Sequence, residues 1–495
     1  MGEHLFKTSV RVVVLVGCLS VGGLPRVWAQ TQTTGVHATL DVKATKMRSK
    51  SAGYQLKKTI SPGFDVSSKG FNTQIDGHWQ FDMVDYTRNR VTEKDSILPS
   101  GLLKLRAFGH QNEPGIDASI EAKQVKSTLP VGAAASDTAN TYTDTTYRLS
   151  PFIEHELDSE TRITARLDRS LTQSNAIDAA QKPRPDIQKS DDMLKLSRQP
   201  TSLGYALQWH HHQEKSKDKK SVKTAPILNE RLAQATALYT LTPELGMGLS
   251  FGKGNVRIGN ESESQKLLGM QMNWRPTERT VLNTEIQKRY FGKAWTLNAS
   301  HTMRGVVFSL NSDRGVSTNG KLVDQGFDKA TFYDVGAQIR QSTSGKMTLI
   351  GRRDTTTIEA GLVRTSPLTD INGKSISSSP TTGGLTTASP PTASSTKTYF
   401  FDAQLAHKLT PHSTVTMGLR WDQGATTVET TTSVPVSSAT RNTVFSKGFT
   451  WRAGINNRLT PDTTATFGLK RQITRSPSIT TSDDAEMFVG LGHRF

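Results

Sequence analysis

Three consecutive histidines, His210 to His212, could ligate a metal ion, and a lysine-rich segment at 215 to 220 follows them. Zinc sites use three or four protein ligands. Neighbouring residues of a strand point to opposite faces, so only His210 and His212 could share an ion, and no third ligand stands beside them. We therefore expect no metal and no cofactor here. The run is better interpreted as a basic surface segment that pairs with phosphate groups or is solvated.

The sequence lacks the common motifs of catalytic sites. The sequence has no Gly-x-Ser-x-Gly elbow, no His-Glu-x-x-His pair and no phosphate-binding Walker loop. Asp483 and Asp484 form a pair of adjacent acids, which in a connecting segment are usually solvated. We expect no catalytic residues and no enzymatic activity.

A set of basic residues recurs at alternate positions and would line one face of its segments. Rings of Arg and Lys in a pore favour anions. The same residues could instead pair with acids such as Asp334, Asp402 and Asp422 and only stiffen the wall, and the sequence leaves both interpretations open. The basic set is Arg275, Arg289, Arg340, Lys408, Arg420, Arg452, Arg458 and Lys470.

These residues belong to segments of about ten residues in which apolar and polar positions alternate. A period of two is typical of strands whose two faces meet different surroundings. In the last segment Met487, Val489, Leu491 and Phe495 fall on one face, with His493 among them. In the strand expected at 413 to 424, alternate apolar residues face outward and Arg420 faces inward.

Short and long connections alternate between these segments. The short ones contain Pro, Thr, Asp or Ser, which favour tight turns. They lie at 157 to 160, 198 to 201, 241 to 244, 275 to 278, 343 to 345, 409 to 412 and 459 to 462. The long ones lie at 88 to 96, 127 to 141, 174 to 190, 213 to 224, 313 to 328, 355 to 396 and 424 to 442. The longest, 355 to 396, is rich in Ser, Thr, Pro and Gly, and we expect a mobile extracellular loop.

With 34% hydrophobic residues, the chain of 495 residues lacks the apolar cores that soluble domains of this length would need. After the first thirty residues no run of about 18 apolar residues occurs, so a transmembrane helix is not expected. Strands with one apolar face, joined by alternately short and long connections, are the layout of an outer-membrane barrel. We predict an all-β fold, a transmembrane antiparallel up-and-down β-barrel of about 22 strands, with 18 to 24 accepted.

The N-terminus reads as an export signal. Basic residues precede an apolar stretch, and a Val-x-Ala pattern ends at Ala29, so we predict a signal peptide over 1–29, cleavage before Gln30 and a barrel over 30–495. The competing interpretation is a lipoprotein acylated at Cys18. If cleavage follows Ala29, the only cysteine leaves with the signal and thiol chemistry is excluded.

The net charge of +17 suggests an anionic partner. Nucleic acid, an anionic membrane surface and an anionic solute all fit that charge. Because the protein is expected to be exported from the cytoplasm, nucleic acid is excluded as a natural partner. Outer-membrane lipid and lipopolysaccharide, or an acidic substance passing through the barrel, remain as expected partners.

The central block resembles one family. Trp274-Arg275-Pro276-Thr277-Glu278-Arg279-Thr280, Arg289-Tyr290-Phe291-Gly292 leading to Trp295 and Leu297, and Ser300-His301 followed by Arg304 are similar to motifs of the outer-membrane β-barrels associated with the PEP-CTERM system. Ile60-Ser61-Pro62-Gly63-Phe64 and the ending Gly492-His493-Arg494-Phe495 resemble further segments of that family. The 355 to 396 loop is a departure from its pattern.

The resemblance implies a Gram-negative outer-membrane protein linked to exopolysaccharide synthesis and export. The last segment, with Met487, Val489, Leu491 and Phe495 on its lipid-facing side, itself resembles the C-terminal signal that the barrel-assembly machinery recognises. We expect a channel that conducts exopolysaccharide, with an anion-preferring lumen and with periplasmic export proteins as partners. A general diffusion porin and a structural or adhesion barrel that presents its surface loops remain alternatives.

Overall fold

The structure is a computed structural model. It describes residues 33–49, 53–70, 72–86, 96–109, 114–126, 141–176, 186–199, 202–217, 224–258, 261–317, 338–367, 393–431, 439–476 and 479–495. The predicted signal peptide and its cleavage site at Ala29 and Gln30 lie outside these residues. In the described part, no helix is long and apolar enough to cross a membrane.

The described chain forms 22 strands, as predicted. They are β1 (Thr33–Ser49), β2 (Gly53–Lys69), β3 (Thr73–Tyr86), β4 (Ser96–Phe108), β5 (Gly115–Lys126), β6 (Thr141–Glu156), β7 (Thr161–Ala176), β8 (Asp186–Arg198), β9 (Leu203–Lys217), β10 (Thr224–Thr242), β11 (Leu245–Ile258), β12 (Glu261–Thr277), β13 (Thr280–Arg289), β14 (Gly292–Met303), β15 (Val306–Ser317), β16 (Gln338–Ile350), β17 (Asp354–Pro367), β18 (Ala393–Lys408), β19 (Ser413–Thr431), β20 (Ala439–Arg458), β21 (Thr463–Ser476) and β22 (Ile479–Arg494).

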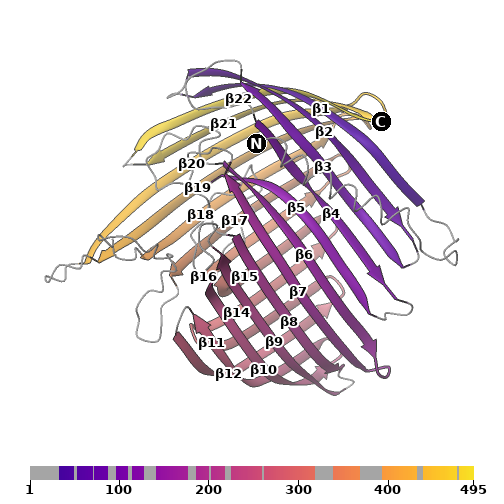
Figure 1. The fold of residues 1–495 in the computed structure, drawn as a ribbon, viewed down its shortest axis with the longest axis vertical. Helices are drawn as coiled ribbons and strands as arrows, with labels where there is room; N and C mark the ends of the chain where they lie inside the picture. The colour runs from indigo at the N-terminus through magenta and orange to yellow at the C-terminus, as the bar shows by residue number, and fades with distance from the viewer. Residues whose placement is uncertain are drawn as a thin grey trace.

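Each strand pairs antiparallel with its neighbours in sequence, and β1 pairs with β22, which closes the sheet into a barrel. Figure 1 shows this closure as the last strands, in yellow, lying beside the first, in indigo. A closed sheet leaves no edge strand with unpaired backbone groups, which is what an apolar environment requires. The predicted all-β, up-and-down antiparallel barrel is confirmed.

The two faces of the sheet differ in chemistry. On the outer face, large apolar side chains are exposed, for example Leu249 and Phe251 on β11 and Leu268, which is 67% exposed, on β12. The residues between them point to the inner face and are mostly polar or small. The predicted faces of the strand at 413 to 424 are the observed ones, since Met417 is exposed and Arg420 is buried.

The barrel has two different ends. At the end that we call the turn end, short connections join β6 to β7, β8 to β9, β10 to β11, β12 to β13, β18 to β19 and β20 to β21, at the places where the sequence predicts tight turns. At the opposite end, the loop end, most of the connections lie outside the described residues.

In the β6–β7 turn at the turn end, Oδ1 of Asp158 accepts backbone N–H groups from Glu160 at 2.8 Å and Thr161 at 2.7 Å. These two bonds hold the pKa of the Asp158 carboxyl below its ordinary value.

One predicted turn is wrong. Residues 343 to 345 lie inside β16, and the turn follows at 351–353. The Gln-Ser-Thr-Ser-Gly run at 341–345 has turn-like composition, but its backbone groups are taken up by ladders with β15 and β17. The pairing partners of β16, rather than its composition, determine its conformation.

The expected long loop also differs from the structure. Its beginning, from Asp354 to Pro367, is strand β17, and β18 starts at Ala393; residues 368–392 lie outside the described part. Other strands likewise reach into connections predicted as long, including β15 to Ser317 and β19 to Thr431. The extensions of β15 and β19 are mostly polar, so their sequence lacks a clear alternation, whereas β17 does alternate, with Ile358, Ala360 and Leu362 on its outer face.

The closing seam involves the last residue. The backbone N–H of Phe495 donates to the carbonyl of Ala38 on β1 at 2.8 Å. Met487, Val489 and Leu491 lie on the outer face of β22, where all three are exposed. The residues predicted as an assembly signal therefore form the outer surface of the strand that closes the barrel.

Candidate functional site

The inner wall formed by β18 to β22 holds three of the predicted basic residues close together. Arg420 is only 6% exposed and lies directly opposite Asp402 in the β18–β19 pairing. Arg452 donates from Nη2 to Oε1 of Gln404 at 3.2 Å, and it is paired across the sheet with Lys470. This wall therefore carries adjacent cations together with a carboxylate.

Two further predicted cations lie on inner-face positions nearer the loop end. Arg289, at the end of β13, forms an ion pair with Glu230 of β10, and both side chains are largely buried. Arg340 of β16 lies opposite Thr365, and its Nε atom is buried without a hydrogen-bond partner among the described residues.

The other three predicted cations are exposed at the turn end. Arg458 donates from Nε and Nη2 to the carbonyl of Pro461, at 3.1 and 2.7 Å, and so caps the β20–β21 turn. The backbone N–H groups of Arg275, near the end of β12, and of Lys408, at the end of β18, donate to the carbonyls of Glu244 and Arg353. These three are separated along the barrel from the group around Arg420.

Another part of the inner wall, from β4 to β8, carries a second group of inner-face arginines, which the sequence analysis did not select. Asp117 of β5 binds both Arg106 of β4, at 2.8 Å, and Arg166 of β7, at 2.8 Å. Arg148 of β6 forms an ion pair with Asp168 of β7. The same alternation could have identified these arginines. Their acidic partners lie up to 49 residues away, and the sheet register brings them together.

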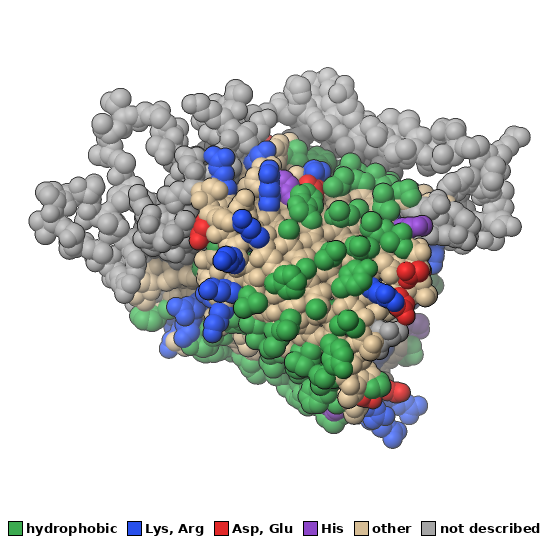
Figure 2. All heavy atoms as spheres, turned by 90° about the horizontal axis from the view of Figure 1, so that it is seen from below, with side chains coloured by type: hydrophobic (Ala, Val, Ile, Leu, Met, Phe, Trp, Pro, Cys, Tyr) green, Lys and Arg blue, Asp and Glu red, His purple; other side chains and the backbone are tan. Residues whose placement is uncertain are grey.

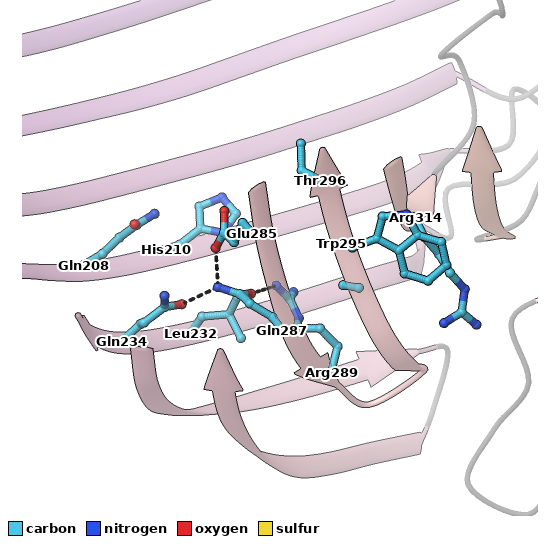
Figure 3. Close-up of a pocket in the computed structure, with 11 residues that line it drawn as sticks. Gln208, His210, Leu232, Gln234, Glu285, Gln287, Arg289, Trp295, Thr296 and Arg314 are labelled. Atoms are coloured by element: carbon cyan, nitrogen blue, oxygen red, sulfur yellow. Dashed lines mark hydrogen bonds between the residues drawn. The ribbon is translucent and has the colours of Figure 1, made fainter. Parts of the chain in front are cut away.

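A hollow of about 320 Å³ opens on the inner face beside the β13–β14 hairpin. Amide, carboxylate and guanidinium groups line it. Gln287 donates from Nε2 to Gln234 at 3.3 Å and to Glu285 at 2.6 Å, and it accepts from Arg289 at 3.5 Å. Figure 3 shows these side chains converging, with Gln208 and His210 next to them. Such a set offers many donors and acceptors and little net charge.

The hairpin beside the hollow contains the most specific motif of the chain, Arg289-Tyr290-Phe291-Gly292. Gly292 has φ of 101°, a conformation that glycine adopts without strain. The backbone N–H of Tyr290 donates to Oε1 of Gln265 at 2.8 Å, and Tyr290 and Phe291 pack against the buried pair Leu228 and Val256. The motif thus fixes a tight hairpin whose aromatic rings cover the inner face at the loop end.

The histidine run divides between the two faces, as predicted. On the inner face, Asp191 of β8 lies between His210 and His212, 2.7 Å from Nε2 of the first and 3.2 Å from Nδ1 of the second. His211 points to the outer face, where its Nδ1 atom lies 3.4 Å from Asp192. The acid that the sequence analysis did not find is therefore on the adjacent strand, and it pairs with the imidazoles of both inner histidines.

Three inner-face phenylalanines share one arrangement. Each ring covers a glycine directly opposite on the neighbouring strand, and each lies under a cation. Phe488 covers Gly468, with Nζ of Lys43 4.0 Å from the ring centre. Phe400 covers Gly361 beneath Arg420, and Phe152 covers Gly115 beneath Arg106 and Arg166. A methyl group at any of these glycines would collide with the ring, so the glycines are needed for close packing.

No protein-family model matches the chain, and no curated protein matches it in sequence. Among solved structures, the FrpB iron transporter from Neisseria meningitidis (F3-3 variant) superposes with a TM-score of 0.46 at 10% identity, over 93% of this chain and 81% of that one. The copper transporter OprC gives a TM-score of 0.45 at 7% identity, over 95% and 82%.

Pseudomonas aeruginosa OccK2 (OpdF) is similar over 93% of this chain and 98% of its own, with a TM-score of 0.39 at 12% identity. Because all these identities and TM-scores are low, they assign no family and no substrate. The site has to be interpreted from its own residues.

Proposed function

We propose that the protein is a Gram-negative outer-membrane β-barrel channel that conducts exopolysaccharide, with a lumen that prefers anions. In this proposal the turn end faces the periplasm, the loop end faces the exterior, and the chain belongs to the PEP-CTERM-associated barrels that its central motifs resemble. Periplasmic export proteins and the barrel-assembly machinery are the proposed partners.

The observation that carries the proposal is a closed sheet with an apolar outer face and a polar inner face. The outer face meets the requirement for contact with lipid, and the inner face suits a water-filled path. Even the shortest strand, β13, has 10 residues, enough for a tilted strand to cross the hydrocarbon region of a membrane. A soluble protein would have no reason to expose this many large apolar side chains on one continuous face.

The charge distribution of the two inner walls supports anion preference. On the wall from β4 to β8, arginines are paired with carboxylates, which offsets their field. On the wall from β18 to β22, Arg420 pairs with Asp422 at 3.8 Å, while Arg452 and Lys470 lie side by side in the register with Glu486 opposite Lys470. Adjacent cations on a water-filled path lower the free energy of an anion beside them.

The hollow beside the β13–β14 hairpin supports a saccharide as the solute. Gln208, Gln234 and Gln287 present amide donors and acceptors that can exchange hydrogen bonds with sugar hydroxyl groups. The Arg289 guanidinium next to them adds charge-assisted donors. Glu230 of β10 forms an ion pair with Arg289 and offsets its charge, so the hollow is polar but has no strong electric field of its own.

Two measurements test the proposal. In planar bilayers of neutral lipid, the purified protein should give single-channel currents with a reversal potential that favours anions. Deletion of the gene should abolish secretion of the polysaccharide. A barrel that does not conduct contradicts the channel, and conduction with unchanged secretion would instead indicate a general diffusion porin.

A further inference from the structure

The outer face carries a series of basic residues that the channel does not use. They occur as four pairs, and in each pair the two residues lie directly opposite each other on neighbouring strands. The pairs are Lys253 with Lys266, Lys288 with Lys293, Arg364 with Lys397, and Lys447 with Arg475. We call these eight residues the outer collar.

The collar lies at the loop-end border of the apolar outer face. Large apolar side chains are exposed on the same face, each two residues from a collar residue toward the turn end. They are Phe251 next to Lys253, Leu268 next to Lys266, Ile286 next to Lys288 and Tyr399 next to Lys397. Figure 2 shows Lys and Arg side chains aligned along one border of the hydrophobic surface. On β11 to β14, β17 and β18 the collar is therefore placed where the lipid-facing surface ends, whereas on β20 the exposed Phe445 lies one outer-face position beyond Lys447.

Direct opposition of like charges destabilises a sheet. All eight side chains are exposed, and within the described ranges none of them forms an ion pair with a carboxylate. The outer-face arginine Arg169 provides a contrast, because it is paired with Asp192. Four unneutralised pairs of like charge would be unfavourable unless an anion from outside the protein lies between the two members of each pair.

We propose that the outer collar binds the phosphate groups of anionic lipid headgroups in the leaflet at the loop end. Phosphates lie just beyond the hydrocarbon region, which is the height of the collar relative to the exposed apolar side chains. Each Lys or Arg at such a surface contributes favourably to binding of anionic lipid, and a Lys pair can share one phosphate through several N–H donors. The inference rests on the proposed placement of the barrel in an outer membrane.

A matched pair of variants tests the inference. The collar variant K253Q/K266Q/K288Q/K293Q removes four outer charges. The control K104Q/K123Q/K195Q/K346Q removes four lysines on inner-face positions, so the change in net charge is the same. Binding of bisphosphorylated lipid A to each detergent-purified, folded protein is measured by native mass spectrometry, with dephosphorylated lipid A as the second probe.

We expect the collar variant to bind lipid A about tenfold more weakly than the wild type, and the control to bind as the wild type does. Added salt should reduce the difference. Equal binding by the collar variant and the wild type would overturn the inference, as would equal binding of the dephosphorylated lipid.

Two further outcomes reassign the collar. Full competition by inorganic phosphate would indicate a site for free phosphate instead of lipid. Loss of binding to anionic polysaccharide in the collar variant, with lipid A binding unchanged, would indicate a surface polymer. The channel proposal is judged separately, because its currents are measured in neutral lipid and depend on inner-face residues.

Discussion

The Oγ1 atom of Thr463 and the Nδ1 atom of His493 lie 2.8 Å apart on the outer face at the turn end. Thr463 is the first residue of β21, and His493 is directly opposite it on β22. Thr280 and His301 repeat the arrangement at 2.7 Å on β13 and β14. The histidines of two separate sequence motifs therefore have one structural role. Each fixes the register of two paired strands at the end of the barrel opposite to their connection, which is the turn end.

His493 should contribute to stability through this bond. We expect H493A to lower the free energy of unfolding by about 1 kcal/mol, since a partly buried hydrogen bond is lost. Urea unfolding in lipid vesicles measures the change. His155 of β6 also lies on the outer face at the turn end, and its exposed side chain has no hydrogen-bond partner in the described part of the chain, so H155A is the control. Equal losses in the two variants would contradict the role of the bond.

Phe495 should matter for closure of the barrel. Deleting it removes both its ring and the backbone N–H that donates to Ala38, whereas F495A keeps the N–H. We expect the deletion to impair assembly more than F495A does, measured as the fraction of heat-modifiable, folded protein in isolated outer membranes. Normal insertion of the deletion variant would count against the assembly-signal interpretation.

Phe488 should stabilise the inner wall by covering Gly468. F488A removes the ring from both the glycine and the Lys43 ammonium, and we expect a loss of about 1–3 kcal/mol of stability. G468A should be comparably destabilising, because its methyl group would lie 2.3 Å from Cζ of Phe488. The double variant F488A/G468A relieves that clash. A double variant that loses the sum of the two single effects would argue against direct packing.

The cations of the β18–β22 wall should set ion selectivity. We expect R452Q/K470Q to reduce the anion-to-cation permeability ratio by roughly twofold or more, because the field along the path falls when adjacent charges are removed. Reversal potentials in a salt gradient measure the ratio. R458Q, at the turn end, is the matched arginine control. An unchanged ratio in R452Q/K470Q would favour the interpretation that these residues only stiffen the wall.

Asp158 should make the β6–β7 turn sensitive to acid. Hydrogen bonds from the backbone N–H groups of Glu160 and Thr161 lower its folded-state pKa below 3.8. The Asp158 carboxylate therefore contributes its full stabilisation of the fold at pH values above its ordinary pKa. That stabilisation is lost as the pH falls through the lower folded-state pKa. We expect wild type and D158A to differ in thermal midpoint at neutral pH and to converge in strong acid. A difference that persists in strong acid would refute the assignment.

The sequence by itself determined the fold class, the approximate number of strands and the face to which most residues belong. A strand between lipid and water must alternate apolar and polar residues, so strands such as β19 and β22 record their two faces in every second position. The tight turns with Pro, Thr or Asp are equally local, because those residues form the turn with their own backbone neighbours.

Only the tertiary structure decided the partners. The run at 341–345 is a strand because β15 and β17 lie beside it, and β17 itself extends where composition suggested a loop. Arg420 faces Asp402, while Arg458 binds a turn carbonyl, although both were predicted from the same alternation. The collar pairs become visible only in the register of neighbouring strands. Hydrogen bonds between strands and Coulomb interactions depend on distance in space, and the pairing of the closed sheet sets that distance.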